Sequence, residues 1–319
     1  MSRHRRAGSE KSFCFQTRSR SVKNAAVLRI LRRRQRKIQV PAFLEGLETE
    51  IFFLCPPVPA HFELPEVIME FPDRKEYIHP MPKYALITGA SRGIGKAVAD
   101  MLAADGYHLY LTCIHSKEAL FAYAEELSER YGVSCTPFVG DMGNENTVDN
   151  LFSFIPDLDV LINNAGISYV GLLSEMSAAD WKKVMATNVD SVFYTSRRAI
   201  PLMLRKQCGR IINISSVWGN VGASMEAAYS ASKGAVNSFT KALAKELAPS
   251  HIQVNAIACG VMDTDMNRCF SAEDMEALRQ EIPCDRIGDP AEAAGMVRSL
   301  LSAPEYLTGQ IITLDGGWT

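Results

Sequence analysis

From residue 81 onward, short apolar runs alternate with longer stretches in which apolar residues recur at helical spacing. Helical spacing is present, for example, over 95–104, 117–131, 181–207 and 229–248. Apolar runs of strand length cover 84–88, 109–113, 133–139, 160–162, 210–214, 253–257 and 310–314. Runs of this length, separated by helices, predict repeated strand–helix–strand units.

This alternation predicts one α/β domain over residues 81–319. Strands that alternate with helices form a parallel sheet, because each crossover helix returns the chain to the same edge. We therefore expect a single Rossmann-type, doubly wound parallel sheet of about seven strands with helices on both faces. Such a sheet binds its ligand beyond the carboxyl ends of the strands, where the strand order reverses.

Residues 1–80 differ from the rest in composition. Residues 1–40 hold thirteen Arg and Lys against one acid, Glu10, and residues 41–80 are rich in proline and acid. Neither half has the periodicity of a packed element, so we place the domain boundary at Met81. Three interpretations stay open: an organellar transit peptide, a disordered basic tail that contacts nucleic acid or anionic lipid, and a true translation start at Met81.

The overall composition limits the classes of function. The chain has 319 residues, of which 47% are hydrophobic, and a formal net charge of −2, which argues against a nucleic-acid binder held by charge. Its eight cysteines lack a C-x-x-C pair, which favours reduced thiols over disulfides or a zinc site. No apolar run is long enough to cross a bilayer. We expect a cytoplasmic protein without a metal.

A glycine-rich turn follows the first predicted strand. Residues 88–95 read Thr-Gly-Ala-Ser-Arg-Gly-Ile-Gly and lead into a helix. Glycines let the backbone turn tightly and approach a pyrophosphate at the helix N-terminus. The pattern resembles the cofactor loop of the short-chain dehydrogenase/reductase family, T-G-x-x-x-G-x-G. The resemblance implies these cofactor contacts: Gly89, Ser91, Arg92, Gly93, Ile94 and Gly95.

The end of the second predicted strand indicates which nicotinamide cofactor binds. A carboxylate there would hydrogen-bond the ribose 2′-hydroxyl of NAD and repel the 2′-phosphate of NADP. No acid follows this strand before Glu118. Arg92, His115 and Lys117 instead supply cations and hydrogen-bond donors for a phosphate. We therefore expect NADPH.

Further cofactor positions follow from the family resemblance. The family places a carboxylate against the adenine ring after the third strand, where residues 141–142 stand here. Residues 163–166 match the family's N-N-A-G element, which lines the cofactor. With the segment after the sixth strand, the additional expected contacts are Asp141, Met142, Asn164, Ala165, Gly166 and Val261.

A tyrosine and a lysine four residues apart stand at the start of a predicted helix. Tyr229 and Lys233 therefore share one helix face, where the ammonium favours the phenolate and lowers the pKa of the tyrosine from about 10. Ser216 closes the fifth strand, and Asn188 supplies the family's fourth catalytic position. By resemblance, Tyr229 protonates the carbonyl oxygen, Ser216 holds it, and Lys233 orients the ribose. Asn188 is expected to organise a water.

The resemblance covers residues 83–319, and its nearest branch is 3-oxoacyl-[acyl-carrier-protein] reductase. It implies reduction of a 3-oxoacyl thioester in fatty acid biosynthesis, an acyl carrier protein as partner, and a homotetramer. Some positions depart from that branch. Cys259-Gly260 replaces the usual Pro-Gly, and Gln207 and Ser250 stand where arginines often grip the carrier.

Residues 216–226 resemble a different branch, the reductases of elongation factor P modification. Those enzymes reduce a 5-aminopentanone attached to a lysine. A carboxylate beside a substrate amine forms a charge-assisted pair, so Trp218 and Glu226 are candidate substrate contacts. Glu226 as a merely solvated acid is the alternative. A non-catalytic nucleotide-sensing protein is a third possibility, and the presence of all four catalytic groups argues against it.

Overall fold

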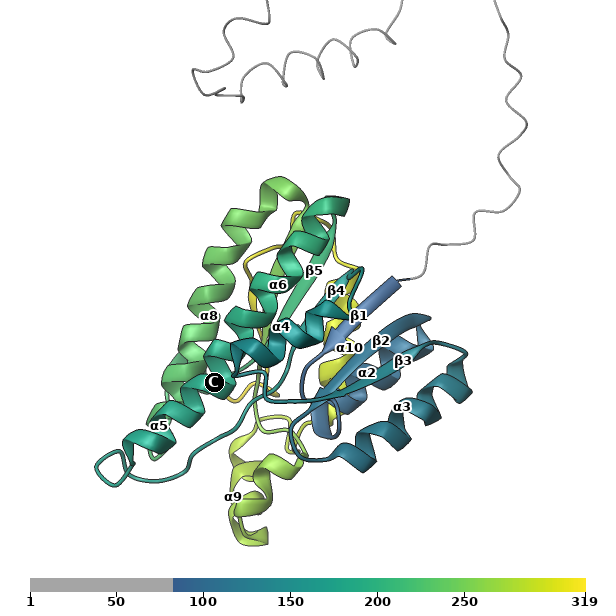
Figure 1. Ribbon diagram of the computed structural model, residues 1–319. Helices are drawn as coiled ribbons and strands as arrows, with labels where there is room; N and C mark the ends of the chain where they lie inside the picture. The colour runs from purple at the N-terminus through teal and green to yellow at the C-terminus, as the bar shows by residue number, and fades with distance from the viewer. Residues whose placement is uncertain (1–82) are drawn as a thin grey trace, which may run out of the picture. The chain divides into compact units, whose positions relative to one another are not determined.

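The computed structural model describes residues 83–319, so the expectations for residues 1–80 and the boundary at Met81 lie outside the described part. Seven parallel strands form one sheet in the order β3-β2-β1-β4-β5-β6-β7 (Figure 1). They are β1 (Lys83–Ile87), β2 (Tyr107–Cys113), β3 (Cys135–Val139), β4 (Val160–Asn163), β5 (Gly209–Ser216), β6 (Ile252–Cys259) and β7 (Ile311–Leu314). The predicted doubly wound sheet is confirmed, and its strand order reverses between β1 and β4.

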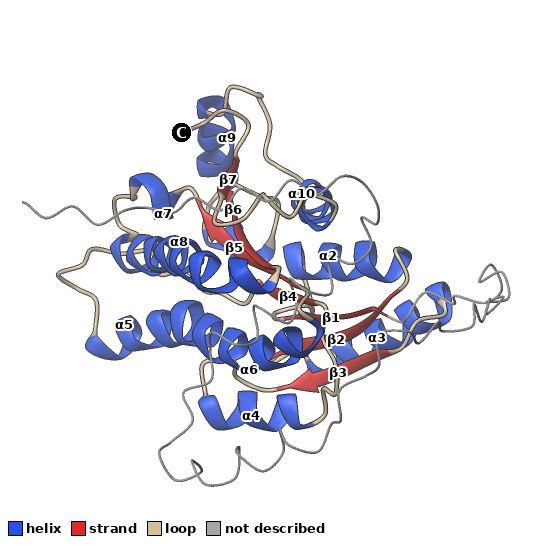
Figure 2. Ribbon diagram, turned by 90° about the horizontal axis from the view of Figure 1, so that it is seen from above, coloured by secondary structure: helices blue, strands red, loops and turns tan. Residues whose placement is uncertain are grey.

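The helices of the described part cover both faces of this sheet (Figure 2). One face carries α2 (Gly93–Ala104), α3 (Lys117–Tyr131) and α10 (Pro290–Leu301). The other carries α4 (Glu145–Ser153), α5 (Ala178–Met185), α6 (Ser191–Lys206) and α8 (Ala227–Leu247). Two further helical elements, the short α7 (Trp218–Val221) and α9 (Ala272–Glu281), follow β5 and β6, and α9 stands apart from the layers in Figure 1.

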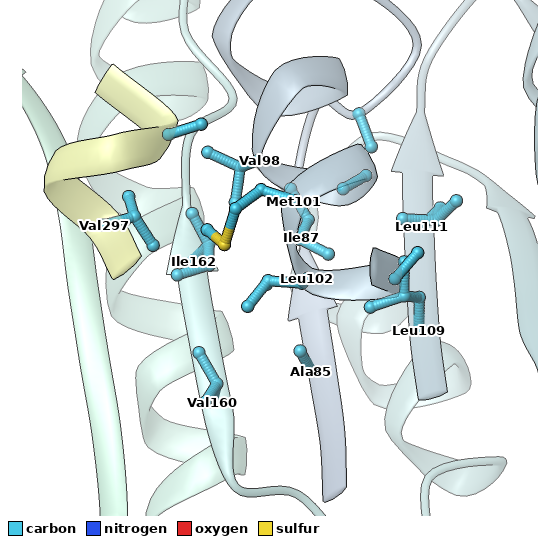
Figure 3. Packing of buried hydrophobic residues seen from close by; sticks show 14 of the residues in the cluster. Ala85, Ile87, Val98, Met101, Leu102, Leu109, Leu111, Val160, Ile162 and Val297 are labelled. Carbon is cyan, nitrogen blue, oxygen red and sulfur yellow. The ribbon is translucent and has the colours of Figure 1, made fainter. Parts of the chain in front are cut away.

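Each face of the sheet has its own apolar core. On the first face, Val98 and Leu102 of α2 meet Ile87 of β1, Ile162 of β4 and Val297 of α10 (Figure 3). All five side chains are fully buried. Burial of each side chain of this size contributes about 1.5–3 kcal/mol, so the core fixes α2 firmly against the strands that hold the site.

A second core lies on the opposite face and contains Leu161 of β4, Met203 of α6 and Val254 of β6. Beside it runs a chain of buried amide and hydroxyl groups. Asn163 Nδ2 donates to Asn213 Oδ1 at 2.9 Å, and Asn213 Nδ2 donates to Thr240 Oγ1 of α8 at 2.8 Å. Because unpaired buried amides are costly, this chain sets the position of α8 against β5.

One predicted helix differs in the structure. The single helix expected over 181–207 is interrupted by a π-helical turn, η1 (Ala186–Asp190), which joins α5 to α6. π-Turns insert a residue into an α-helix and are frequent at functional sites. Asn188, a predicted catalytic residue, lies within this turn and is 1% exposed.

Candidate active site

Four predicted catalytic side chains come from three separate elements at the carboxyl end of the sheet. Ser216 is the last residue of β5, Tyr229 and Lys233 lie in the first turns of α8, and Asn188 lies in η1. Each is less than a tenth exposed. A β-carbon added to Gly166 would lie 3.4 Å from both Asn188 Oδ1 and Lys233 Nζ, so this glycine sits directly beside both groups. The structure thus brings these side chains into one buried cluster.

The environment of Tyr229 keeps its phenol protonated. Burial raises the pKa of Tyr229 well above its ordinary value, the hydrogen bond with Ser216 acts in the opposite direction, and the Glu226 carboxylate adds to the rise. The net pKa of Tyr229 is therefore raised, not lowered as expected from the neighbouring Lys233, because removal of the phenolate from water outweighs the hydrogen bond with Ser216. A neutral phenol is a proton donor, which is the form needed to protonate a carbonyl oxygen.

Lys233 is held by the backbone behind the tyrosine. Its Nζ donates to the carbonyl oxygen of Ile214 at 2.8 Å and lies 5.6 Å from the centre of the Tyr229 ring. Burial lowers the pKa of Lys233 to about 8, while the neighbouring Cys259 acts in the opposite direction. An ammonium poised near neutral pH retains donors for a ligand hydroxyl, because within residues 83–319 it donates to one carbonyl oxygen, that of Ile214.

Asn188 closes the site from the opposite side. Its Oδ1 accepts from the backbone N–H of Ile167 at 2.8 Å, and its Nδ2 donates to the Ile167 carbonyl and to Ser232 Oγ, each at 2.9 Å. Ser232 in turn donates to the carbonyl oxygen of Tyr229 at 2.7 Å. The amide thus ties the loop after β4 to α8, and this bracing could not be inferred from the sequence pattern.

The glycine-rich turn forms a narrow cradle at the N-terminus of α2. Gly89 and Gly93 adopt φ values of 67° and 55°, which favour glycine. A β-carbon on Gly95 would lie 2.3 Å from the carbonyl oxygen of Gly89 and 2.5 Å from Asn164 Nδ2, so this position admits glycine alone. Asn164 Nδ2 also donates to the carbonyl oxygens of Thr88 and Gly89 at 2.9 and 3.0 Å. This cradle suits a pyrophosphate at the helix N-terminus.

A cavity of about 500 Å³ opens beside this cradle. Its lining includes Gly93 and Lys96 on one side and Thr264, Asp265 and Arg268 on the other. Thr264 lies in the segment after β6, and its methyl carbon would lie 3.2 Å from a β-carbon on Gly93. The cavity is of the size of ligand sites, and it shares Gly93 with the predicted cofactor contacts.

The other predicted cofactor residues lie where strands end, with differing burial. His115 follows β2 and is exposed, as is Asp141, whose Oδ1 accepts the backbone N–H of Gly143 at 2.8 Å. Met142 is buried in the second core, whereas Val261 after β6 is half-buried. The half-buried members at the cradle and the neighbouring turn are Ser91, Ile94, Asn164, Ala165 and Gly166. Arg92 is exposed and therefore open to a ligand.

The two predicted substrate residues have partners that the sequence did not indicate. The ring of Trp218 lies 4.8 Å from the ring of Trp318, centre to centre, at an interplanar angle of 60°. Glu226 Oε1 accepts a hydrogen bond of 2.7 Å from Ser168 Oγ. Trp318 follows the last strand and Ser168 follows β4. Their positions shortly after a strand end are the one feature of the sequence from which a place near the site could have been predicted.

Neither a metal-binding group of residues nor a helix able to span a membrane is found within residues 83–319. Five described cysteines form no disulfide; they are Cys113, Cys135, Cys208, Cys259 and Cys284.

A doubly wound sheet, a phosphate cradle and a buried Ser–Tyr–Lys–Asn cluster together define an oxidoreductase that acts on CH–OH/C=O groups with a nicotinamide cofactor. The short-chain dehydrogenase model matches residues 83–274, and the chain belongs to this family.

Three relatives illustrate the resemblance. An uncharacterised oxidoreductase of Bacillus subtilis, YmfI, is 41% identical over 75% of this chain and 99% of its own length. The 3-oxoacyl-[acyl-carrier-protein] reductase FabG of Aquifex aeolicus is 37% identical over 74% of this chain and 96% of its own. A variant of actinorhodin polyketide ketoreductase, solved with NADPH, is 32% identical with a TM-score of 0.70, and the match covers 74% of this chain and 97% of that one.

Proposed function

We propose that this protein is an NADPH-dependent carbonyl reductase that converts a 3-oxoacyl thioester to the 3-hydroxyacyl product. The observation that carries the proposal is the buried, protonated Tyr229 with Ser216 at its hydroxyl and Lys233 behind it. The similarity to 3-oxoacyl-[acyl-carrier-protein] reductases supports the choice of substrate class, and an acyl carrier protein is then the natural partner.

When bound, a reduced nicotinamide supplies hydride to the carbonyl carbon. The developing negative charge then falls on the carbonyl oxygen, which needs fixed donors. Tyr229 donates its phenolic proton to that oxygen, and the Ser216 hydroxyl holds the oxygen in place. Both groups are preorganised, since Ser216 Oγ also accepts from the backbone N–H of Trp218 at 3.2 Å. This arrangement lowers the barrier without reorganisation during the reaction.

The remaining groups orient the cofactor and resupply the proton. Lys233 holds the ribose hydroxyls through the donors that it does not use on Ile214. Asn188 keeps the loop after β4 closed on α8 and positions the water that returns a proton to Tyr229. The site needs no metal for this chemistry, because a positioned acid and an oxyanion donor perform the same polarisation.

The choice of NADPH rests on charge at the edge of the cofactor groove. Arg92 at the cradle is exposed, as are His115 and Lys117 after β2. A phosphate on the ribose would find a guanidinium and further donors there, and it would meet no carboxylate on the turn between β2 and α3. The similarity to a ketoreductase solved with NADPH supports the same choice.

A second candidate substrate is favoured by Glu226. Its carboxylate is close enough to Tyr229 to raise the pKa of the phenol, and it is fixed by the hydrogen bond from Ser168. A half-buried carboxylate beside a catalytic acid gains most when the substrate carries an ammonium. This supports a ketone with an amine, of the protein-linked 5-aminopentanone type on elongation factor P. The 41% identity to an oxidoreductase of unassigned substrate is compatible with either choice.

One experiment tests the main proposal. The full chain is incubated with acetoacetyl thioester and either NADPH or NADH, and loss of reduced cofactor is followed by absorbance. Turnover with NADPH that is abolished in Tyr229→Phe supports the thioester reductase. Tight NADPH binding without thioester turnover rejects that substrate. In that case Glu226→Gln is compared with the unchanged protein on an aminoketone substrate, where a loss of activity supports the second candidate.

A further inference from the structure

Asp265 links the cofactor cradle to the segment that follows β6. Its Oδ2 lies 3.5 Å from Nη1 of Arg92 in the cradle, and its Oδ1 lies 2.5 Å from Nη2 of Arg268. Asp265 begins the short helix η3 (Asp265–Cys269), one residue after Thr264. One carboxylate therefore pairs with a cation of the cradle, Arg92, and with a cation of its own helix, Arg268.

The surroundings of Asp265 leave this arrangement open to a ligand. The Arg92 side chain is 67% exposed and that of Asp265 is 29% exposed. Thr264 approaches Gly93 closely, so the carboxylate and the cradle are held near each other by contact as well as by charge. Asp265 and Arg268 also line the cavity of about 500 Å³, together with Gly93 of the cradle.

We propose that Asp265 competes with the 2′-phosphate of the cofactor for Arg92 and thereby determines how strongly the protein distinguishes NADPH from NADH. The proposal rests on the assignment of Arg92 as a phosphate ligand in the proposed function. A phosphate on Arg92 displaces the Asp265 carboxylate, which keeps Arg268 as its partner. Binding of the phosphate therefore frees the segment 264–269 from the cradle without leaving an unpaired carboxylate.

The physical reason is competition between two anions for one guanidinium. A carboxylate near a phosphate repels it, and each anion that pairs with Arg92 weakens the attraction of the other. NADH carries a hydroxyl at the same ribose position, so it leaves the Arg92–Asp265 pair in place. Both effects depend on charge, so they diminish as salt is added.

The first test measures equilibrium binding of NADPH and NADH to the full chain and to Asp265→Asn by cofactor fluorescence. Removal of the carboxylate is expected to tighten NADPH binding about fivefold, the upper range for an exposed ion pair, and to leave NADH binding within about twofold. Asp263→Asn is the matched control, since Asp263 lines the same cavity and makes no ion pair in the described part of the chain. Unchanged or weaker NADPH binding by Asp265→Asn overturns the proposal.

The second test follows amide hydrogen exchange over 264–269 with saturating NADPH or NADH. The unchanged protein is expected to exchange faster with NADPH than with NADH, and this difference is expected to vanish in Asp265→Asn. Arg92→Gln tests the binding of the phosphate to Arg92 separately from the competition by Asp265. If Arg92→Gln leaves NADPH binding unchanged, the phosphate assignment itself fails. If Arg92→Gln weakens NADPH binding but Asp265→Asn has no effect, only the competition fails.

Discussion

The ammonium of Lys233 lies 5.6 Å from the centre of the Tyr229 ring and is bonded to the Ile214 carbonyl oxygen at 2.8 Å, behind the phenol. The two side chains have opposite ionisation tendencies. Burial raises the pKa of Tyr229 and lowers that of Lys233 to about 8, because both charged forms lose water. The phenol is therefore the acid of the site, and the ammonium is the group that titrates near working pH.

Replacement of Tyr229 by phenylalanine removes the acid and keeps the ring. We expect kcat to fall roughly 10²–10⁴-fold, the usual contribution of a positioned acid. Cofactor binding and thermal stability should change little, because the ring fills the same space. Steady-state kinetics and cofactor fluorescence measure the two effects separately. Retention of most of the activity in Tyr229→Phe would contradict the assignment of the acid.

The pH dependence of turnover should follow Lys233. As pH rises through about 8, the ammonium loses its proton, so kcat/KM for reduction is expected to fall. The raised pKa of Tyr229 keeps the phenol from causing this decline. Lys233→Arg, which stays charged, should flatten the alkaline limb even where its overall rate is lower. An alkaline limb identical in both proteins would exclude Lys233 as its source.

The same titration has a consequence for stability, with the opposite sign. The pKa of Lys233 is about 8 in the folded protein and near 10.5 in the unfolded chain. Between these values the unfolded state binds more protons, so the contribution of this group to stability rises with pH over that window. Urea unfolding of the unchanged protein and of Lys233→Met at pH 8 and pH 10 measures the contribution. A difference between the two proteins that does not vary with pH would refute it.

Gly95→Ala should damage the cradle. A β-carbon there would lie 2.3 Å from the carbonyl oxygen of Gly89, so the loop must move. We expect a loss of about 1–3 kcal/mol in unfolding free energy together with weaker NADPH binding. Gly295→Ala, inside α10 with nothing within 4 Å, is the control and should stabilise by about 0.5–1 kcal/mol. Equal behaviour of the two variants in urea unfolding would argue against the close packing.

Asn188→Ala should destabilise the protein by about 1–3 kcal/mol, because it leaves the backbone N–H and carbonyl of the half-buried Ile167 without their partner. The isosteric Asn188→Asp keeps the acceptor for the Ile167 N–H but loses the donor to the Ile167 carbonyl and to Ser232 and buries a charge, so a loss of stability at least as large is expected. Urea unfolding and kcat are measured for both. If Asn188→Ala lowers kcat without loss of stability, the bracing role is wrong and only the water-positioning role stands.

Much of the fold and of the site could be predicted from the sequence, because it depends on residues that are close together along the chain. Apolar periodicity fixed the seven strands and the sheet, and the glycine spacing at 89, 93 and 95 fixed the cradle, since each depends on neighbours along the chain. The four-residue spacing of Tyr229 and Lys233 placed both on one helix face. These predictions agree with the structure.

Other features depend on residues far apart in sequence, and only the tertiary structure decided them. The π-turn around Asn188 interrupts a helix that the periodicity predicted as continuous. The raised pKa of Tyr229 reverses a prediction made from its neighbour Lys233, because the extent of burial is set by packing from several elements. Asp265 and Arg92 are 173 residues apart in sequence (265 − 92). They form an ion pair because the segments that hold them both follow strands at the carboxyl edge of the sheet. Residues that pair across such separations leave no pattern in the neighbouring sequence, so tertiary packing alone determines which of them meet.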